Sequence, residues 1–366
     1  MKNRGVKSER SSPPLFLKAR SLSSETKTKA KKSQSALTRE EMEANLRDAY
    51  ASKAMRGSPR DYFQLLKPRV MSLVVFTGFT GLIISQSWAN IHMNPLLAAV
   101  AVFCIAIGAG AAGALNMAIE GETDALMRRT RMRPVAAGRV TKSDAYAFGG
   151  VLAFLSVALM WLAFPDGLAA SLLALTIAYY VVFYTLILKR RTPQNIVIGG
   201  AAGAFPPVIG WAAATGHAPI EAWILFAIIF LWTPPHSWAL ALYTTEDYAN
   251  AGIPMMPVAK GAKSTRLQIL LYSLVMAPVA CLPIAFHMGG LVYAVVSILG
   301  GAFFIYLAVR VFLSRAGDHP EGGEASLYDV KKEALAARNL FAFSILYLTA
   351  LFATLLVEHV ITGLMS

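Results

Sequence analysis

Residues 95–119 read PLLAAVAVFCIAIGAGAAGALNMAI, an apolar run of 25 residues without a charged side chain. About 20 apolar residues are enough for an α-helix to cross the hydrocarbon core of a membrane. The run therefore predicts a membrane-spanning helix. A loop crowded with acidic and basic residues follows it directly.

Eight further segments are also long and predominantly apolar. Hydrophobic residues make up 56% of the 366 residues and charged residues 15%, and the mean hydropathy is +0.51. These values are typical of a chain whose main solvent is lipid. The sequence predicts an all-α, polytopic membrane protein with about nine transmembrane helices. The expected spans are residues 71–87, 95–119, 145–164, 168–188, 195–215, 222–242, 268–287, 291–312 and 340–361.

Basic residues gather on one side of these spans. Of the 34 Lys and Arg residues, 15 lie in the first 60 positions, and the other 19 avoid the short connections after odd-numbered spans. Because basic loops stay in the cytoplasm, we expect the long charged loops and the N-terminus to lie there. Anionic lipid headgroups account for the net charge of +13 better than nucleic acid does.

The first 60 residues are rich in Ser, Lys and Thr and precede an intramembrane domain at 61–366. They lack an apolar run of signal-peptide length, and acidic residues such as Glu40 and Asp48 argue against a mitochondrial transit peptide. They predict a basic, largely disordered cytoplasmic tail with a short helix near residues 38–54. A bacterial inner membrane is therefore favoured over a mitochondrial one. The two cysteines, Cys104 and Cys281, are interpreted as packing residues.

Polar residues follow a helical spacing where the second span ends. Asn116, Glu120 and Asp124 stand at i, i+4 and i+8, so on a helix they line one stripe. Neighbouring carboxylates repel each other. A bound Mg²⁺ would relieve this repulsion, because Mg²⁺ prefers oxygen ligands and commonly binds carboxylate oxygens together with phosphate oxygens of a substrate. The alternative is a solvated loop of mixed charge.

The two long inner loops carry further charged groups. Arg129 and Arg133 follow the acidic stripe, and their planar guanidinium groups suit phosphate oxygens. The loop after the sixth span opens with Glu246 and Asp247 and leads to Lys260. Asp247 facing the first acidic pair would complete a clamp around a metal and a diphosphate, with Lys260 as a further diphosphate contact.

The inner connection after the fourth span is also basic. Lys189 and Asn195 are interpreted as contacts to the same diphosphate, and the alternative is an ordinary basic anchor at the membrane surface. The segment Lys67-Pro68-Arg69, before the first span, fits an anchor better than a site.

Double prolines occur inside two adjacent spans, at Pro206-Pro207 and at Pro234-Pro235. Because proline removes a backbone hydrogen bond, we expect both helices to break and to open a cavity for a large, flat, apolar acceptor. His236 follows the second pair and is interpreted as a haem-binding residue, either as a ligand of the iron or as a hydrogen-bond donor. The alternative is a histidine that only joins two helices by a hydrogen bond.

Four segments of the chain, taken together, resemble the UbiA-type intramembrane prenyltransferases, and within them the protohaem farnesyltransferases. They read DALMRRTRMRP at 124–134, KRRTPQNIVIGG at 189–200, TPPH at 233–236 and DYANAGIPMMPV at 247–258. The resemblance extends from residue 61 to the end of the chain. This sequence departs from the family at Glu120 and Glu122, where Asp is usual.

The resemblance implies nine helices around a central cavity that opens to the cytoplasmic side and to lipid. It implies farnesyl diphosphate and protohaem IX (haem B) as substrates and haem O, used in haem A and cytochrome oxidase biogenesis, as product. Mg²⁺ held by Asn116, Glu120, Asp124 and Asp247 would assist ionisation of the diphosphate. The downstream haem A synthase is an implied partner.

Two alternatives remain open at this point. The first is a prenyltransferase of the same class whose acceptor is a quinone-precursor phenol or a chlorin, although the segment 233–236 argues against this acceptor. A secondary transporter would also contain broken helices. The acidic residues, however, lie at the mouths of the inner loops and not at the bilayer midplane, which favours catalysis at the interface.

Overall fold

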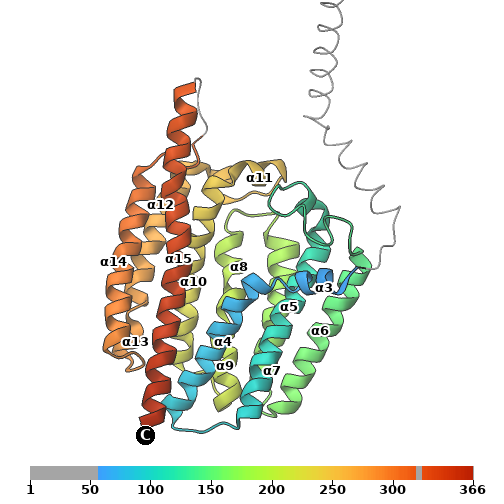
Figure 1. Cartoon of the computed structure of the whole chain (residues 1–366), viewed down its shortest axis with the longest axis vertical. Coiled ribbons are helices and arrows are strands. Elements are labelled where there is room, and N and C mark those ends of the chain that lie inside the picture. The colour runs from blue at the N-terminus through green and yellow to red at the C-terminus, as the bar shows by residue number, and fades with distance from the viewer. Residues whose placement is uncertain (1–56, 319–323, 366) are drawn as a thin grey trace, which may run out of the picture. The chain divides into compact units, whose positions relative to one another are not determined.

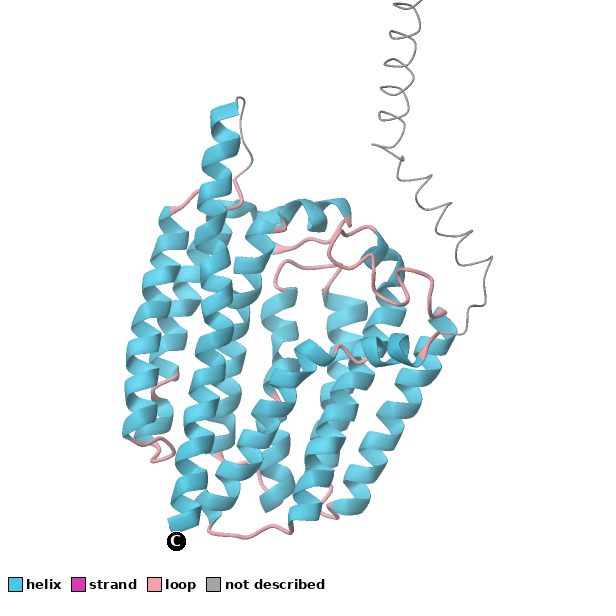
Figure 2. Cartoon of the chain, viewed as in Figure 1, coloured by secondary structure: helices cyan, strands magenta, loops and turns pink. Residues whose placement is uncertain are grey.

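Helices form all the regular structure of residues 57–318 and 324–365, the part of the chain that the computed structural model describes (Figure 2). The all-α prediction is confirmed for these residues. The predicted short helix near residues 38–54, and nearly all of the predicted tail, lie outside them. The division of the chain at residue 60 therefore stays a prediction.

Nine helices in the described residues are long and apolar enough to span a membrane, and each matches a predicted span. The chain is a multi-pass membrane protein. The spans are α4 (Pro68–Ala89), α5 (Pro95–Ala125), α6 (Lys142–Ala163), α7 (Leu168–Ala178) continued by the π-helix η1 (Tyr179–Leu188), α8 (Asn195–Ala204) with α9 (Pro206–Thr215), α10 (Ile220–Tyr243), α12 (Met256–Val279) with α13 (Leu282–Ala285), α14 (Leu291–Leu313) and the apolar part of α15 (Glu324–Met365).

Two short helices accompany the spans. The helix α11 (Thr245–Asn250) lies at the end of the bundle that carries the long loops, and α3 (Pro59–Leu65) runs across α5 (Figure 1). Ser58 caps α3 in a reciprocal pair with Asp61, and Arg139 Nε donates to Asp61 Oδ1 at 2.7 Å. The hydrogen bonds from Arg139 and Ser58 hold the pKa of the Asp61 carboxyl below its usual value. These contacts fix the entry to α4 against the loop after α5.

The helix α5 is longer than the predicted span, which ended at residue 119. It runs for 31 residues to Ala125, so Glu120 and Asp124 lie on the helix itself. Both carboxylates are paired with cations from other segments. Because the pairs neutralise the two buried charges, the helix can continue past Glu120.

The two double prolines behave differently. The fifth span breaks at Phe205, between α8 and α9, as predicted. The prediction was wrong for the sixth span, because α10 continues through Pro234 and Pro235. Proline's fixed φ is compatible with a helix. Burial of both prolines, in a helix that packs against α8, α12 and α15, holds the remaining turns together.

Glycines allow α4 and α9 to touch through their backbones. A Cβ atom added to Gly81 would overlap the carbonyl oxygen of Pro207, and one added to Gly210 would overlap that of Gly78. Small residues at such crossings are the usual means of close helix packing in membranes. This contact fixes α4, whose inner end leads into the site described below.

We expect Gly81→Ala to destabilise the protein by about 1–3 kcal/mol, since the added methyl group meets backbone atoms that cannot rotate away. The measurement is the apparent melting temperature of the purified protein in detergent. Gly150→Ala is the matched control, because nothing lies within 4 Å of its added Cβ atom. Equal melting temperatures for the two variants would contradict the packing explanation.

Candidate active site

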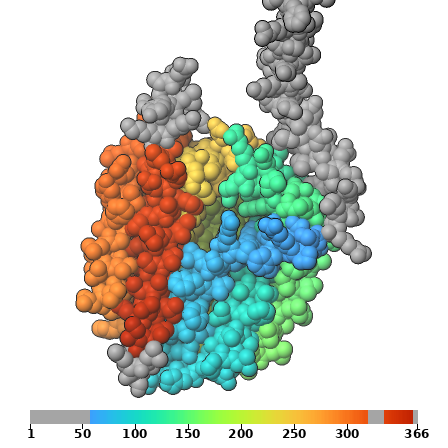
Figure 3. Space-filling view, viewed as in Figure 1, coloured from blue at the N-terminus to red at the C-terminus, as the bar shows by residue number. Residues whose placement is uncertain are grey.

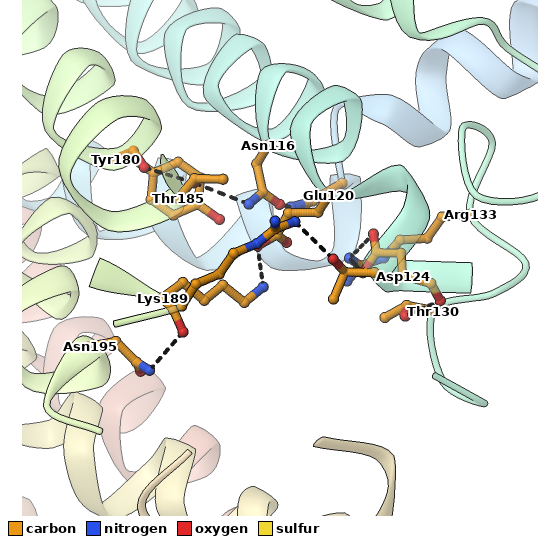
Figure 4. Close-up of polar contacts among 12 residues, drawn as sticks. Asn116, Glu120, Asp124, Thr130, Arg133, Tyr180, Thr185, Lys189 and Asn195 are labelled. Atoms are coloured by element: carbon orange, nitrogen blue, oxygen red, sulfur yellow. Dashed lines mark hydrogen bonds and ion pairs between the residues drawn. The ribbon is translucent and has the colours of Figure 1, made fainter. Parts of the chain in front are cut away.

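A row of three buried polar side chains lines the inner end of α5 (Figure 4). Asn116 and Asp124 are each 2% exposed, and Glu120 is 4% exposed. The predicted stripe is therefore confirmed as one helix face that points into the protein. Glu122, which lies between the row members in sequence, is exposed on another face and pairs with Lys142 at 2.5 Å.

Each member of the row contacts a basic side chain from another part of the chain. Lys67 donates to Asn116 Oδ1. Lys189 Nζ lies 2.5 Å from Glu120 Oε1. The third cation belongs to Arg133, whose Nη1 donates to both oxygens of Asp124 at 2.9 and 2.7 Å. The site thus brings together the predicted residues of α5, Arg133 and Lys189.

Lys67 was interpreted as an anchor, and the structure places it in the site instead. It precedes Pro68, the first residue of α4, and adopts a left-handed conformation with φ of 51°. Such a backbone costs about 1–3 kcal/mol, and residues that adopt it are enriched at functional sites. Burial of its ammonium group and the nearby charge of Arg133 lower its pKa to about 7, against the opposing effect of Glu120.

The loop after η1 brings Lys189 to the row. Asn195, the first residue of α8, is fully buried, and its Nδ2 lies 3.4 Å from the carbonyl oxygen of Lys189. Its Oδ1 is buried without a hydrogen-bond partner in the described part of the chain. Arg190 donates to Thr123 at 3.0 Å and so ties the same loop to α5. Asn195 therefore holds Lys189 in place, and its contact with a ligand stays a prediction.

Three other predicted residues, Arg129, Asp247 and Lys260, make no hydrogen bond or ion pair with this row in the described part of the chain. The two long loops meet at Arg128 and Glu246, whose charged atoms are 4.0 Å apart and largely exposed. Asp247 is half-buried, and Arg129 and Lys260 are exposed. Within residues 57–318 and 324–365, no group of three or more His, Cys, Asp or Glu side chains is arranged to hold a metal. The roles of these three residues stay predictions.

His236 lies in α10, seven residues and about 10 Å of helix rise before the helix ends. Its ring stacks between Trp232 and Phe341, at centroid distances of 4.2 and 4.6 Å. Its Nδ1 lies 2.7 Å from Ser344 Oγ, which donates its own proton to the Phe341 carbonyl at 2.6 Å. Because a hydroxyl has one proton, Nδ1 must be the donor to Ser344, and Nε2 keeps a free lone pair.

From the sequence, Lys67, Thr185 and Ser344 were not assigned to a site. Thr185 accepts a hydrogen bond from Asn116 Nδ2, and Ser344 contacts His236. Lys67 carried one signal, a basic residue immediately before the proline that begins a span. Thr185 and Ser344 carried none, because each is an ordinary polar residue in an apolar run and contacts a partner far away in sequence.

The model of the UbiA prenyltransferase family matches residues 74–322. The chain belongs to this family. A curated relative from Maricaulis maris, "Protoheme IX farnesyltransferase", is 61% identical over 303 residues, which cover 83% of this chain and 90% of the relative. Family membership makes the chain a prenyltransferase and removes the transporter alternative.

Solved structures share the fold. A structure of digeranylgeranylglyceryl phosphate synthase aligns with a TM-score of 0.61 and 16% identity, over 81% of this chain and 98% of that one. A UbiA homologue from Archaeoglobus fulgidus bound to GPP and Mg²⁺ aligns with a TM-score of 0.52 and 14% identity, over 79% of this chain and 99% of that one. At these identities the likeness shows the fold alone.

Proposed function

We propose that this chain transfers the farnesyl group of farnesyl diphosphate to a vinyl group of protohaem IX and so produces haem O. The observation that carries the proposal is the buried row of Asn116, Glu120 and Asp124, each held by a cation. The extent of the likeness to the protoheme IX farnesyltransferase of Maricaulis maris supports haem as the acceptor.

The proposed reaction breaks one bond of the diphosphate and makes two new ones on haem. The allylic C–O bond of farnesyl diphosphate breaks, and its electron pair leaves with the diphosphate. The π electrons of the vinyl group form a C–C bond to the allylic carbon. Water then captures the cation beside the porphyrin and loses a proton, which gives a hydroxyethyl farnesyl arm.

The cations of the site suit the leaving group. Lys189 and Arg133 balance the carboxylates Glu120 and Asp124, and Lys67, whose pKa is about 7, adds a positive charge when it is protonated. Fixed positive groups stabilise the negative charge that develops on a departing diphosphate without having to reorganise. Further diphosphate contacts are proposed at Arg129, Asn195 and Lys260.

The row also fits a divalent metal, because all its donors are amide or carboxylate oxygens, which Mg²⁺ prefers. We propose that Asn116, Glu120 and Asp124, with Asp247 from the other loop, hold Mg²⁺. When bound, Mg²⁺ would stabilise the charge on the leaving diphosphate as a Lewis acid. The Archaeoglobus fulgidus structure, described as a UbiA homologue bound to GPP and Mg²⁺, supports the use of a divalent metal.

We place the haem on the side of His236. The hydrogen bond to Ser344 fixes the tautomer in which Nε2 has a free lone pair, and neutral imidazole with such a lone pair is a common iron ligand. The stacked rings of Trp232 and Phe341 hold the imidazole in one plane. The surface is hollowed between α15, α4 and the loop after α5 (Figure 3), which suits entry of a flat acceptor from the side. A central cavity stays a prediction.

We further propose a bacterial inner membrane, with the N-terminus and the site on the cytoplasmic side. All the charged loops named above connect the same ends of the spans, as the positive-inside rule requires. The bacterial source of the Maricaulis relative agrees with this membrane. Delivery of the product to a haem A synthase also stays a proposal.

In bacteria that lack their own enzyme, we expect the wild-type chain to produce haem O, as measured by extraction and mass analysis of haems. Asp124→Asn and Asp247→Asn should each abolish production, because each removes a ligand charge from the diphosphate clamp. Glu122→Gln is the control on the same helix and should retain activity, since Glu122 is exposed on another face. Farnesylation of a phenol in place of haem would establish the alternative acceptor. Full activity of both Asn variants would refute the clamp.

His236→Ala should raise the apparent KM for haem about 10-fold or more while that for farnesyl diphosphate stays nearly unchanged, with added imidazole restoring part of the haem use. His359→Ala is the control, because His359 is also in a span and its contact in the described part of the chain is with the Leu355 carbonyl of its own helix. Equal losses toward both substrates would assign His236 a packing role.

In a background without Cys104 and Cys281, cysteines placed at Ala125 or Ala249 should react with impermeant thiol reagents only from the cytoplasmic face. Both positions lie on the inner side of the predicted topology, where the basic residues gather. Reaction of either cysteine from the outer face would overturn the proposed orientation.

A further inference from the structure

A chain of hydrogen bonds leads away from the α5 row into the fourth span. Asn116 Nδ2 donates to Thr185 Oγ1 at 3.2 Å, and Thr185 Oγ1 donates to the carbonyl oxygen of Tyr180 at 2.8 Å (Figure 4). Asn116 and Thr185 are each 2% exposed, so these contacts are shielded from bulk solvent.

The direction of each bond follows from counting protons. The Thr185 hydroxyl has one proton and gives it to Tyr180, so toward Asn116 it can only accept. The side-chain amide of Asn116 must therefore present its NH₂ group to Thr185, which turns Oδ1 toward Lys67 and the row. Thr185 and Lys67 therefore both favour the orientation in which Oδ1 faces the site.

The π-helix is what makes this contact possible. In η1 the Thr185 hydroxyl reaches the carbonyl five residues back, whereas Thr176, in the α-helical part of the same span, bonds the Leu172 carbonyl four residues back. Short π-helical segments inside α-helices frequently lie at functional sites. In this wider turn the Thr185 hydroxyl donates its proton to the Tyr180 carbonyl. Its oxygen is then free to accept a hydrogen bond from Asn116 on α5.

We propose that Thr185 is a positioning residue that holds Asn116 with its carbonyl oxygen directed at the metal and diphosphate site. This rests on the proposed function, because it assumes that Asn116 Oδ1 is a ligand. A partner that orients a ligand commonly changes metal affinity or activity by about 10–100-fold when it is removed. Lys67 contacts Asn116 Oδ1, the atom that would bind the metal, whereas Thr185 contacts the opposite end of the amide, Nδ2.

The test measures metal binding to the purified full-length protein in detergent. Mn²⁺ is the probe, titrated in the presence of inorganic diphosphate and followed by the electron paramagnetic resonance signal of the free ion. Thr185→Val keeps the shape of the side chain and loses the hydroxyl, and we expect the apparent Kd for Mn²⁺ to rise about 10-fold. Thr185→Ser keeps the hydroxyl and should bind Mn²⁺ nearly as the wild type does.

Two further variants separate this role from simple packing. Thr176→Val removes a backbone-bonded hydroxyl from the same span and should leave Mn²⁺ binding unchanged. Thr185→Ala removes the hydroxyl without adding bulk, and it decides the question if Thr185→Val does not fold. Wild-type affinity in the folded Val or Ala variant, or an equal loss in Thr185→Ser, would overturn the proposal.

The outcome is separable from that of the proposed function. If the wild type binds Mn²⁺ and the Thr185 variants differ as expected, but no haem O is made, the acceptor assignment fails and the positioning role stands. If haem O is made and Mn²⁺ binding does not depend on the hydroxyl, the positioning role fails alone.

Discussion

The structure depends on compensating charge where α5 ends. Two carboxylates, Glu120 and Asp124, are almost fully buried there, and burial of an unpaired charge costs several kcal/mol. Lys189 and Arg133 neutralise them from two different loops. These pairs let α5 continue to Ala125 and hold both loops against it. The fold of the loops and the chemistry of the site therefore have one electrostatic origin.

The spans could be predicted from the sequence because length and hydropathy are local properties. The stripe on α5 could be predicted for the same reason, since residues four apart share a face of any helix. Local signals were insufficient at Pro234 and Pro235, where packing of α10 against its neighbours preserves a helix that two prolines should interrupt. In the fifth span, by contrast, the helix does break at Phe205, immediately before its double proline.

The site was predictable only in part, because its partners come together through tertiary structure. Arg133 and Lys189 were found since they stand in charged loops next to spans. Lys67 was misjudged because its left-handed backbone, which directs the side chain to Asn116, leaves no trace in composition or periodicity. The π-helix was invisible for a similar reason: an apolar run such as residues 179–188 fits α and π geometry equally well.

The contact between α4 and α9 has a consequence for how this sequence can change in evolution. At most helix crossings a larger residue on one side is accommodated by a smaller one on the other, so the two positions vary together. The atoms nearest to Gly81 and Gly210 are backbone atoms, which every amino acid possesses. No exchange on the facing helix can make room for a side chain there. Divergence at these two positions would require the helices themselves to separate, and with them the inner end of α4 that brings Lys67 to Asn116.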